Sequence, residues 1–387
     1  MGRRGRVLGI IVAGGDDSPL GPIGGPGGPA LTPFAGKYRF IDFALATLRN
    51  SGVTEVCVVA PVPAACLRAH LERALRLRRP RVLPLPPGAP RRAARLLQAL
   101  RAASPILRTV APEAVVVLLA DHILLLDLRP LLAAHAARAA DVTLPAFPLP
   151  SSEADGRVTL RADAAGRVDL GTGATAVQAP FALTWAGDVV VRGDVAAVVL
   201  DERLPAEDAA LRARAAALRI DAYDVLASRA PDAAAMGAYW HEPMTLEAYY
   251  GAQMELCTQR PPLDLYNPAW PLPAAVGGLA PAKVVTDAAG RAGQALDSLV
   301  SDGSVIRGGV VIKSVLGHGV VVESGAEVED SILLDGCRIG RGARVRRALI
   351  GAGAVIDDDE EIGYGGAAIA PRRVLRSGLT VVPPATR

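Results

Sequence analysis

A periodic series of aliphatic residues in the last third of the chain constrains its fold more than any other feature. From Val311 to Ile362, a Leu, Val or Ile recurs at spacings of five, six and six residues, three times over. A helix requires a period near 3.6 and an ordinary strand a period of two, so neither accounts for the series. A period near six is typical of a β-helix built from hexapeptide repeats. The full series is Leu299, Val305, Val311, Leu316, Val322, Val328, Leu333, Ile339, Val345, Ile350, Ile356 and Ile362.

These spacings also predict the geometry of the C-terminal region. Three short strands make one triangular coil of about 17 residues, and each coil stacks on its neighbours. The aliphatic side chains then point into the prism, where the coils above and below bury them. We therefore expect a parallel β-helix over residues 294–387, preceded by a Pro- and Gly-rich linker over 263–293.

The first 262 residues follow a different pattern, in which strands alternate with helices. Apolar runs typical of strands cover Val7–Ala13, Val53–Val59, Ala114–Leu119, Val142–Phe147 and Val189–Val191. Helical patterns cover Arg39–Arg49, Ala64–Leu77, Pro90–Ala103, Leu128–Ala140 and Pro205–Leu218. The alternation predicts an α/β domain over 1–262, with a mostly parallel sheet between helices. Ligands of such sheets bind at the carboxyl ends of the strands, which directs attention to the end of the first strand.

Length, charge and cysteine content narrow the class of protein. The chain has 387 residues, of which 51% are hydrophobic, enough for two or three domains with sizeable cores. A net charge of +3 is too small for a nucleic-acid footprint, so we expect no nucleic-acid partner. The run Val7–Ala13 is too short to span a membrane, and we expect no membrane association. The four cysteines form no CxxC pair, which indicates reduced thiols in a cytoplasmic protein and no zinc site.

Three segments carry candidate ligand-binding residues, and each also has a plain structural interpretation. Gly14 and Gly15 follow the first strand and could let backbone N–H groups approach a phosphate, or simply open a flexible loop. Asp121 follows a buried strand and could hold Mg²⁺, or merely cap a turn. Glu242 could be a second carboxylate for that metal, or a solvated residue before a helix capped by Thr245.

Seven motifs then appear in an order that matches one family. They are Ile11-Val12-Ala13-Gly14-Gly15, Phe34-Ala35-Gly36-Lys37-Tyr38-Arg39-Phe40-Ile41-Asp42-Phe43-Ala44-Leu45, Ala120-Asp121-His122-Ile123, Tyr239-Trp240-His241-Glu242, Leu246-Glu247-Ala248-Tyr249-Tyr250, Leu263-Asp264-Leu265-Tyr266-Asn267-Pro268 and Asp297-Ser298-Leu299-Val300. Across essentially the whole chain, this order resembles bacterial ADP-glucose pyrophosphorylase (glucose-1-phosphate adenylyltransferase). The resemblance implies a Rossmann-like nucleotidyltransferase domain, a left-handed β-helix and a tetramer. It also implies transfer of a nucleotidyl group from ATP to glucose 1-phosphate with Mg²⁺, releasing pyrophosphate.

The resemblance also assigns roles to individual residues. It implies that Asp121 and Glu242 hold Mg²⁺, although the family has Asp where this chain has Glu242. It places Asp121 and Lys37 among the catalytic groups. The implied nucleotide-binding positions are Ala13, Gly14, Gly15, Gly88 and Arg91. In such a reaction a sugar-phosphate oxygen attacks the α-phosphorus in line, and negative charge must be neutralised on both sides.

The ligand-facing edge departs from the family's pattern in its positive charges. Pro19 and Pro29 stand where the family has a loop Arg and a Lys, and Asp16 and Asp17 add negative charge nearby. Residues 168–175 align with the segment whose Lys holds the sugar phosphate in the family, yet they contain no lysine. The family's Gly-Thr-Ala-Asp-Ala segment reads Gly88-Ala89-Pro90-Arg91-Arg92 here.

These departures leave more than one function open. Loss of a phosphate-directed Arg typically costs on the order of 10³-fold in rate. Replacement cations are at hand in sequence, namely Lys37, Arg39, Arg91 and Arg92. One hypothesis is therefore an enzyme that joins a nucleoside triphosphate to a sugar or cyclitol phosphate. A second is an inactive paralogue that forms a hetero-oligomer with an active pyrophosphorylase, rather than a homo-oligomer, and regulates that enzyme. A third is a free-standing binding module for a nucleotide sugar.

Overall fold

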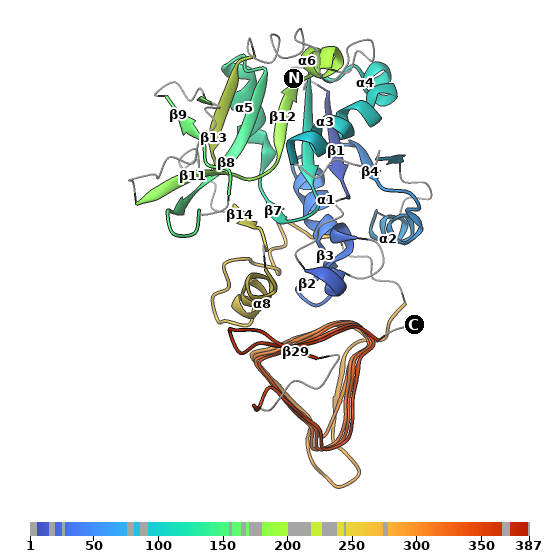
Figure 1. The fold of residues 1–387 in the computed structure, drawn as a ribbon. Helices are drawn as coiled ribbons and strands as arrows, with labels where there is room; N and C mark the ends of the chain where they lie inside the picture. Colours follow the sequence, from blue (N-terminus) through green and yellow to red (C-terminus); the bar gives the residue numbers. More distant parts are fainter. Residues whose placement is uncertain are drawn as a thin grey trace.

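The computed structural model describes residues 6–14, 20–24, 28–75, 81–85, 92–154, 157–163, 168–169, 180–199, 218–226, 238–243, 245–273, 278–365 and 372–385. The N-terminal part is a central sheet with helices on both faces, and the C-terminal part is a triangular prism of stacked strands (Figure 1). Helix α8 (Leu246–Glu255) lies between the two parts. The α/β domain and the β-helix predicted from the sequence are both confirmed.

The central sheet has the strand order β11-β8-β12-β6-β1-β4-β5, and β13 also pairs with β8. Its strands are β1 (Val7–Val12), β4 (Glu55–Ala60), β5 (Val82–Pro84), β6 (Ala114–Leu119), β8 (Val142–Pro150), β11 (Phe181–Trp185), β12 (Val189–Arg192) and β13 (Ile220–Asp224). The sheet is parallel through β6, β1, β4 and β5, but β12 runs antiparallel to both β6 and β8. The described residues between β8 and β12 include no helix, and a parallel neighbour would need such a crossover.

Alternation along β1 explains why helices cover both faces of the sheet. Leu8, Ile10 and Val12 point into the core beneath α3, α4 and α6, whereas Ile11 points into the core beneath α1, α2 and α5. The helices are α1 (Phe40–Asn50), α2 (Ala65–Leu75), α3 (Arg92–Ala102), α4 (Ser104–Val110), α5 (Leu128–Ala137) and α6 (Gly193–Val199). The sequence reasoning missed the two short helices α4 and α6. The helix predicted at Pro205–Leu218 lies outside the described residues, apart from its last position.

Short elements complete the N-terminal part. They are η1 (Gly21–Gly24), η2 (Pro29–Leu31), β2 (Pro33–Phe34), β3 (Tyr38–Arg39), β7 (Ile123–Leu125), β9 (Arg161–Ala162), β10 (Val168–Asp169) and β14 (Tyr239–His241). β7 and β14 form a two-stranded antiparallel ribbon, which becomes important for the site. None of the helices in the described ranges is both long and apolar enough to cross a bilayer.

Three sheets form the sides of the prism. The first contains β15 (Lys283–Val285), β18 (Val305–Arg307), β21 (Val321–Val322), β24 (Arg338–Ile339) and β27 (Val355–Ile356). The second contains β16 (Gln294–Leu296), β19 (Val310–Ile312), β22 (Glu327–Glu329), β25 (Arg344–Arg346) and β28 (Glu361–Ile362). The third contains β17 (Leu299–Val300), β20 (Val315–Leu316), β23 (Ile332–Leu333), β26 (Ala348–Ile350), β30 (Thr380–Val382) and β29 (Arg373–Val374). β15 lies inside the stretch predicted as a linker, so the first coil begins within residues 263–293.

The register of the prism matches the predicted coil length. Val310, Glu327, Arg344 and Glu361 pair in succession, each 17 residues after the last. Each aliphatic position predicted from Val311 onward is at most 2% exposed. The first two positions of the series were wrong, because Ile306 is fully buried in place of Val305, and Val300 pairs with Leu316 in place of Leu299. The repeat there is one residue shorter, since Val300 pairs with Leu316 and Ile306 with Val322, each 16 residues on, so the regular spacing selects the neighbouring residue.

A buried contact joins the prism to the N-terminal domain. Phe34, Phe43 and Tyr249 from the N-terminal part share one core cluster with Val315 and Ile332 of the prism. Leu299 also packs against this cluster. Two polar links cross the same boundary: Arg39 pairs with Asp335, and the Tyr250 hydroxyl donates to the Asp330 carbonyl at 2.6 Å. The motif around Phe34–Phe43 therefore serves the junction between the domains.

Candidate active site

Four predicted residues lie near the carboxyl ends of neighbouring elements. Ala13 and Gly14 directly follow β1, and Asp121 comes two residues after β6. Glu242 directly follows β14, whose His241 pairs with Ile123 of β7. Because Asp121 precedes β7 by two residues, the ribbon brings Asp121 and Glu242 to the same end. The structure thus groups the two carboxylates that the sequence predicted as metal ligands.

Arg95 on α3 connects the end of β1 to Asp121. Its Nη1 atom donates to the Gly14 carbonyl at 2.8 Å and lies 3.2 Å from Asp121 Oδ2. The Arg95 side chain is 12% exposed, and its Nε atom is buried with no hydrogen-bond partner among the described residues. The partly buried Arg95 guanidinium therefore brings positive charge to the carboxyl edge of the sheet. The segment after β1, in which Pro19 and Pro29 replace the family's cations, does not supply that charge.

A buried histidine holds the other oxygen of Asp121. His122 Nδ1 lies 3.0 Å from Asp121 Oδ1, and its Nε2 lies 3.0 Å from Asp188 Oδ2. Burial alone would lower the pKa of His122, but the carboxylates of Asp188 and Asp121 outweigh it and raise that pKa to about 9. The ring is therefore an imidazolium at neutral pH. Asp188 is itself fixed by the Leu119 backbone N–H, which donates to it at 2.8 Å.

Glu242 is paired with a second arginine. Arg157 Nη1 lies 2.7 Å from Glu242 Oε2, and its Nη2 donates to the Glu242 carbonyl at 3.3 Å. The guanidinium also lies over the Trp240 ring, 5.0 Å from its centroid. Trp240 stacks on Phe147 with centroids 5.5 Å apart. The sequence reasoning missed both arginines, because neither belongs to a motif; Arg95 lies four residues after the predicted Arg91 in the sequence.

Lys37 lies apart from these groups. It sits in the turn between β2 and β3, next to Gly36, which packs against Ser301 and Leu316 of the prism. Its ammonium lies 5.5 Å from the centroid of the Tyr38 ring. Within the described ranges, no contact joins Lys37 to Gly14 or Asp121. The catalytic role expected for Lys37 therefore stays a prediction. Arg39, another predicted replacement cation, forms an ion pair with Asp335 at the boundary between the domains.

The remaining predicted nucleotide-binding residues, Gly15, Gly88 and Arg91, lie outside the described residues, as do Asp16, Asp17 and Pro19. Pro29, which replaces the family's lysine, begins η2 and is buried. The described cysteines are all free thiols, as expected.

The donor chemistry of the two carboxylates suits magnesium. Mg²⁺ usually takes one or two protein carboxylates and completes its shell with water and substrate phosphates. Asp121 and Glu242 supply two such carboxylates. No group of three or more His, Cys, Asp or Glu side chains that could enclose a metal occurs in the described part of the chain. Both carboxylates also carry an ion pair, Asp121 with Arg95 and Glu242 with Arg157, so positive charge lies beside each of them.

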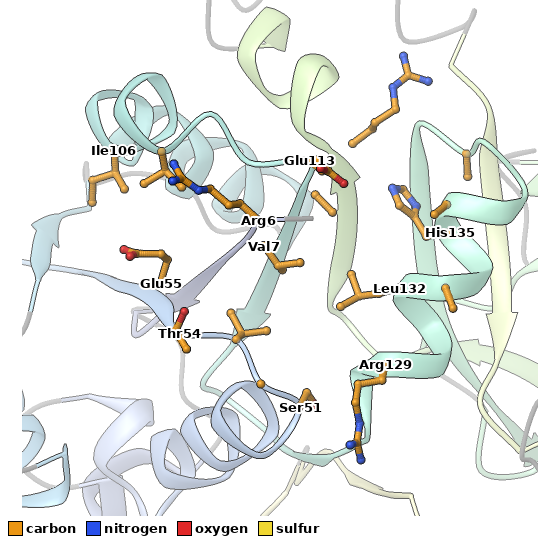
Figure 2. A pocket seen from close by; sticks show the side chains of 18 of the residues that line it. Arg6, Val7, Ser51, Thr54, Glu55, Ile106, Glu113, Arg129, Leu132 and His135 are labelled. Atoms are coloured by element: carbon orange, nitrogen blue, oxygen red, sulfur yellow. The ribbon is translucent and has the colours of Figure 1, made fainter. Parts of the chain in front are cut away.

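A large cavity opens at the opposite edge of the sheet. It has a volume of about 1330 Å³ and lies at the amino ends of β1, β4 and β6, with Leu132 and His135 of α5 on one side and Glu55 on the other (Figure 2). Its arginines are Arg6, Arg81, Arg129 and Arg192, of which the last three pair with Glu55, Asp127 and Asp141. None of the predicted site residues that the structure describes lines this cavity. The candidate active site therefore remains at the carboxyl edge.

Comparison with known proteins agrees with this geometry. Residues 8–169 match the nucleotidyl transferase family, and residues 280–382 match the GlmU-like C-terminal hexapeptide family. The glucose-1-phosphate adenylyltransferase of Deinococcus radiodurans is 30% identical, with 98% of each chain covered. Those of Frankia casuarinae and an Anaeromyxobacter species are 32% and 31% identical, with 97% and 99% of each chain covered. With these full-length relatives and with the sheet and prism that the sequence predicted, the chain belongs to the glucose-1-phosphate adenylyltransferase family.

Proposed function

We propose that this protein transfers a nucleotidyl group from a nucleoside triphosphate to a sugar 1-phosphate, glucose 1-phosphate or a related sugar or cyclitol phosphate, and releases pyrophosphate. The observation that carries the proposal is the position of Arg95. Its guanidinium lies between the Gly14 carbonyl and Asp121, at the edge where a nucleotide's phosphates would approach. A cation from α3 thus takes over charge neutralisation that the substituted loop cannot perform.

The residues at this edge suit in-line transfer at phosphorus. The reaction demands positive charge on the triphosphate and on the attacking phosphate, together with fixed positions for both. Arg95 supplies charge at the end of β1, and Arg157 supplies it at the end of β14. His122, held between Asp121 and Asp188, fixes the orientation of the Asp121 carboxylate. Mg²⁺ bound by Asp121 and Glu242 would add neutralisation of the phosphoryl oxygens.

Arg95→Gln tests this proposal. With Mg²⁺, a panel of nucleoside triphosphates and a panel of sugar and cyclitol 1-phosphates, wild-type protein should release pyrophosphate. Arg95→Gln should lower kcat/KM on the order of 10³-fold, because it removes a phosphate-directed cation. Arg95→Lys should retain part of the activity.

Arg101→Gln is the matched control, because Arg101 lies near the end of the same helix and should not affect turnover. Circular dichroism of each variant checks the fold. No pyrophosphate release by wild-type protein across the whole panel would refute the proposal, and so would full activity in Arg95→Gln.

A second candidate function is favoured by the contacts of Asp121. Both of its oxygens already face cationic groups, Arg95 and His122. If these contacts persist with nucleotide present, the chain would be an inactive paralogue that assembles with an active pyrophosphorylase. Co-expression with an authentic pyrophosphorylase should then give mixed oligomers with altered kinetics. Separate elution of the two proteins would refute this alternative.

A further inference from the structure

We propose that Arg157 binds the phosphate of the acceptor sugar. The inference rests on the proposed transfer reaction and assigns its second anion-binding position. No sequence motif marks this residue. We assign this role to Arg157 from three observations. They are the groups that its guanidinium contacts, the aromatic rings that pack against it, and its pairing compared with that of Arg95.

The neighbours of Arg157 hold its guanidinium in one orientation. Nη1 and Nη2 contact the Glu242 carboxylate and carbonyl, and Nε donates to the Glu153 carbonyl at 3.2 Å. The side chain is 17% exposed, so it is largely desolvated but still reaches the surface. The planar fork of an arginine matches two phosphate oxygens at once, and holding it in place lowers the entropy lost on binding.

An aromatic wall supports this arginine. Trp240 lies against the guanidinium on one side and stacks on Phe147 of β8 on the other, with ring planes 16° apart. The Trp240 indole N–H donates to the Ala186 carbonyl at 3.1 Å. The wall is therefore anchored to two separate segments of the sheet region. A desolvated cation against an indole face is also stabilised electrostatically, which favours retention of charge at this position.

A comparison with Arg95 indicates which phosphate Arg157 binds. Each arginine pairs with one of the two acidic residues at the same end of the β7–β14 ribbon, Arg95 with Asp121 and Arg157 with Glu242. The reaction brings two phosphorylated reactants together at one phosphorus atom. Arg95 bonds to Gly14 at the end of β1, the edge assigned to the nucleotide. Arg157 pairs with Glu242 at the end of β14, away from any contact with Gly14 in the described residues, and we assign the sugar phosphate to it.

Binding can be measured without turnover, because Trp240 reports on its neighbour. Metal-free protein in EDTA is titrated with glucose 1-phosphate, with inorganic phosphate and, separately, with ATP, while tryptophan fluorescence is recorded. Trp240→Phe shows how much of the signal comes from this indole and how much from Trp185 and Trp270. Arg157→Gln should weaken binding of glucose 1-phosphate at least about tenfold, since a hydrogen-bonded charge is lost, and leave ATP binding unchanged.

Arg95→Gln should show the reverse pattern and is the matched control. Glu242→Gln keeps Arg157 but removes its competing carboxylate, so it should bind phosphate more tightly. A purely structural role for the pair predicts weaker binding in that variant. The double variant Arg157→Gln/Glu242→Gln removes both charges together, so that neither is left buried and unpaired and the fold is retained. Like Arg157→Gln, it should bind glucose 1-phosphate weakly.

The proposal is overturned if wild-type protein fails to bind glucose 1-phosphate, or if Arg157→Gln binds it as wild type does. It is also overturned if Glu242→Gln weakens phosphate binding. These outcomes differ from failure of the proposed reaction, which shows as absent pyrophosphate release while phosphate binding still depends on Arg157.

Discussion

The interior of the prism and the ligand edge of the sheet both collect side chains from distant points of the chain, yet they obey different rules. In the prism, the positions of the periodic series from Val311 to Ile362 are all Leu, Val or Ile and at most 2% exposed. At the ligand edge, Pro19 and Pro29 replace two cations expected from the family, while Arg95 and Arg157 face the carboxylates from other segments.

The difference follows from what each region must provide. A prism coil is buried only by the coils next to it, so each strand must present an aliphatic side chain at a fixed interval. A phosphate site needs positive charge within a few ångströms, and a long arginine side chain can deliver that charge from several backbone positions. The charge of a phosphate site can therefore come from more backbone positions than the buried side chain of a coil can, and the predictions below test that contrast.

The largest effect is expected for Val345→Asp in the prism. Val345 is fully buried and pairs with Val328 and Ile362 in the coils on either side. An unpaired carboxylate there should lower the free energy of unfolding by about 4 kcal/mol or more. The matched control is Val355→Asp, because Val355 belongs to the same prism but is 60% exposed. Urea unfolding followed by circular dichroism would measure both, and equal stabilities would contradict the stacking rule.

The same contrast explains how far the sequence could predict the structure. The period from Val311 to Ile362 determined coil length and buried positions, because one local rule repeats in every coil. It was wrong only at Leu299 and Val305, because the repeat there is 16 residues long and the regular spacing of 17 selects the residue before the buried one.

At the ligand edge, strand ends directed attention to Gly14 and Asp121, and the β7–β14 ribbon, which was not predicted, places Glu242 at the same end as Asp121. The two arginines could not be predicted. Arg95 depends on how α3 packs over β1, and Arg157 depends on a loop that reaches Trp240 across the fold. Neither contact produces a periodic pattern in the sequence.

A smaller effect is expected from the buried His122 at the ligand edge. Burial alone lowers its pKa, but the Asp188 and Asp121 carboxylates raise the pKa from 6.5 to about 9, a shift worth about 3 kcal/mol. This stabilisation is complete below pH 6.5 and is lost as the pH rises through about 9. Asp188→Asn removes one carboxylate, so its free energy of unfolding should vary less over that range. Urea unfolding at several pH values, with exposed Asp264→Asn as control, checks this; an unchanged slope in Asp188→Asn would count against it.

The smallest effect is expected where the two regions meet, at Gly36. Its backbone has φ of 76°, and a Cβ atom would collide with Ser301 and approach the Leu316 carbonyl of the prism. Gly52 has a similar φ of 83°, but a Cβ atom there would meet nothing within 4 Å. Gly52→Ala therefore measures the strain of a left-handed backbone alone, about 1 kcal/mol. Gly36→Ala should cost about 1 kcal/mol more, because the prism must also shift.

Ser301→Ala in the Gly36→Ala background separates strain from collision. Removing the serine hydroxyl should recover part of the extra cost, whereas the strain measured by Gly52→Ala should remain. Thermal unfolding of the two single variants and the double variant gives both contributions. If Gly36→Ala costs no more than Gly52→Ala, the contact between the turn and the prism is loose. The motif around Gly36 would then need another explanation than the packing of the two regions against each other.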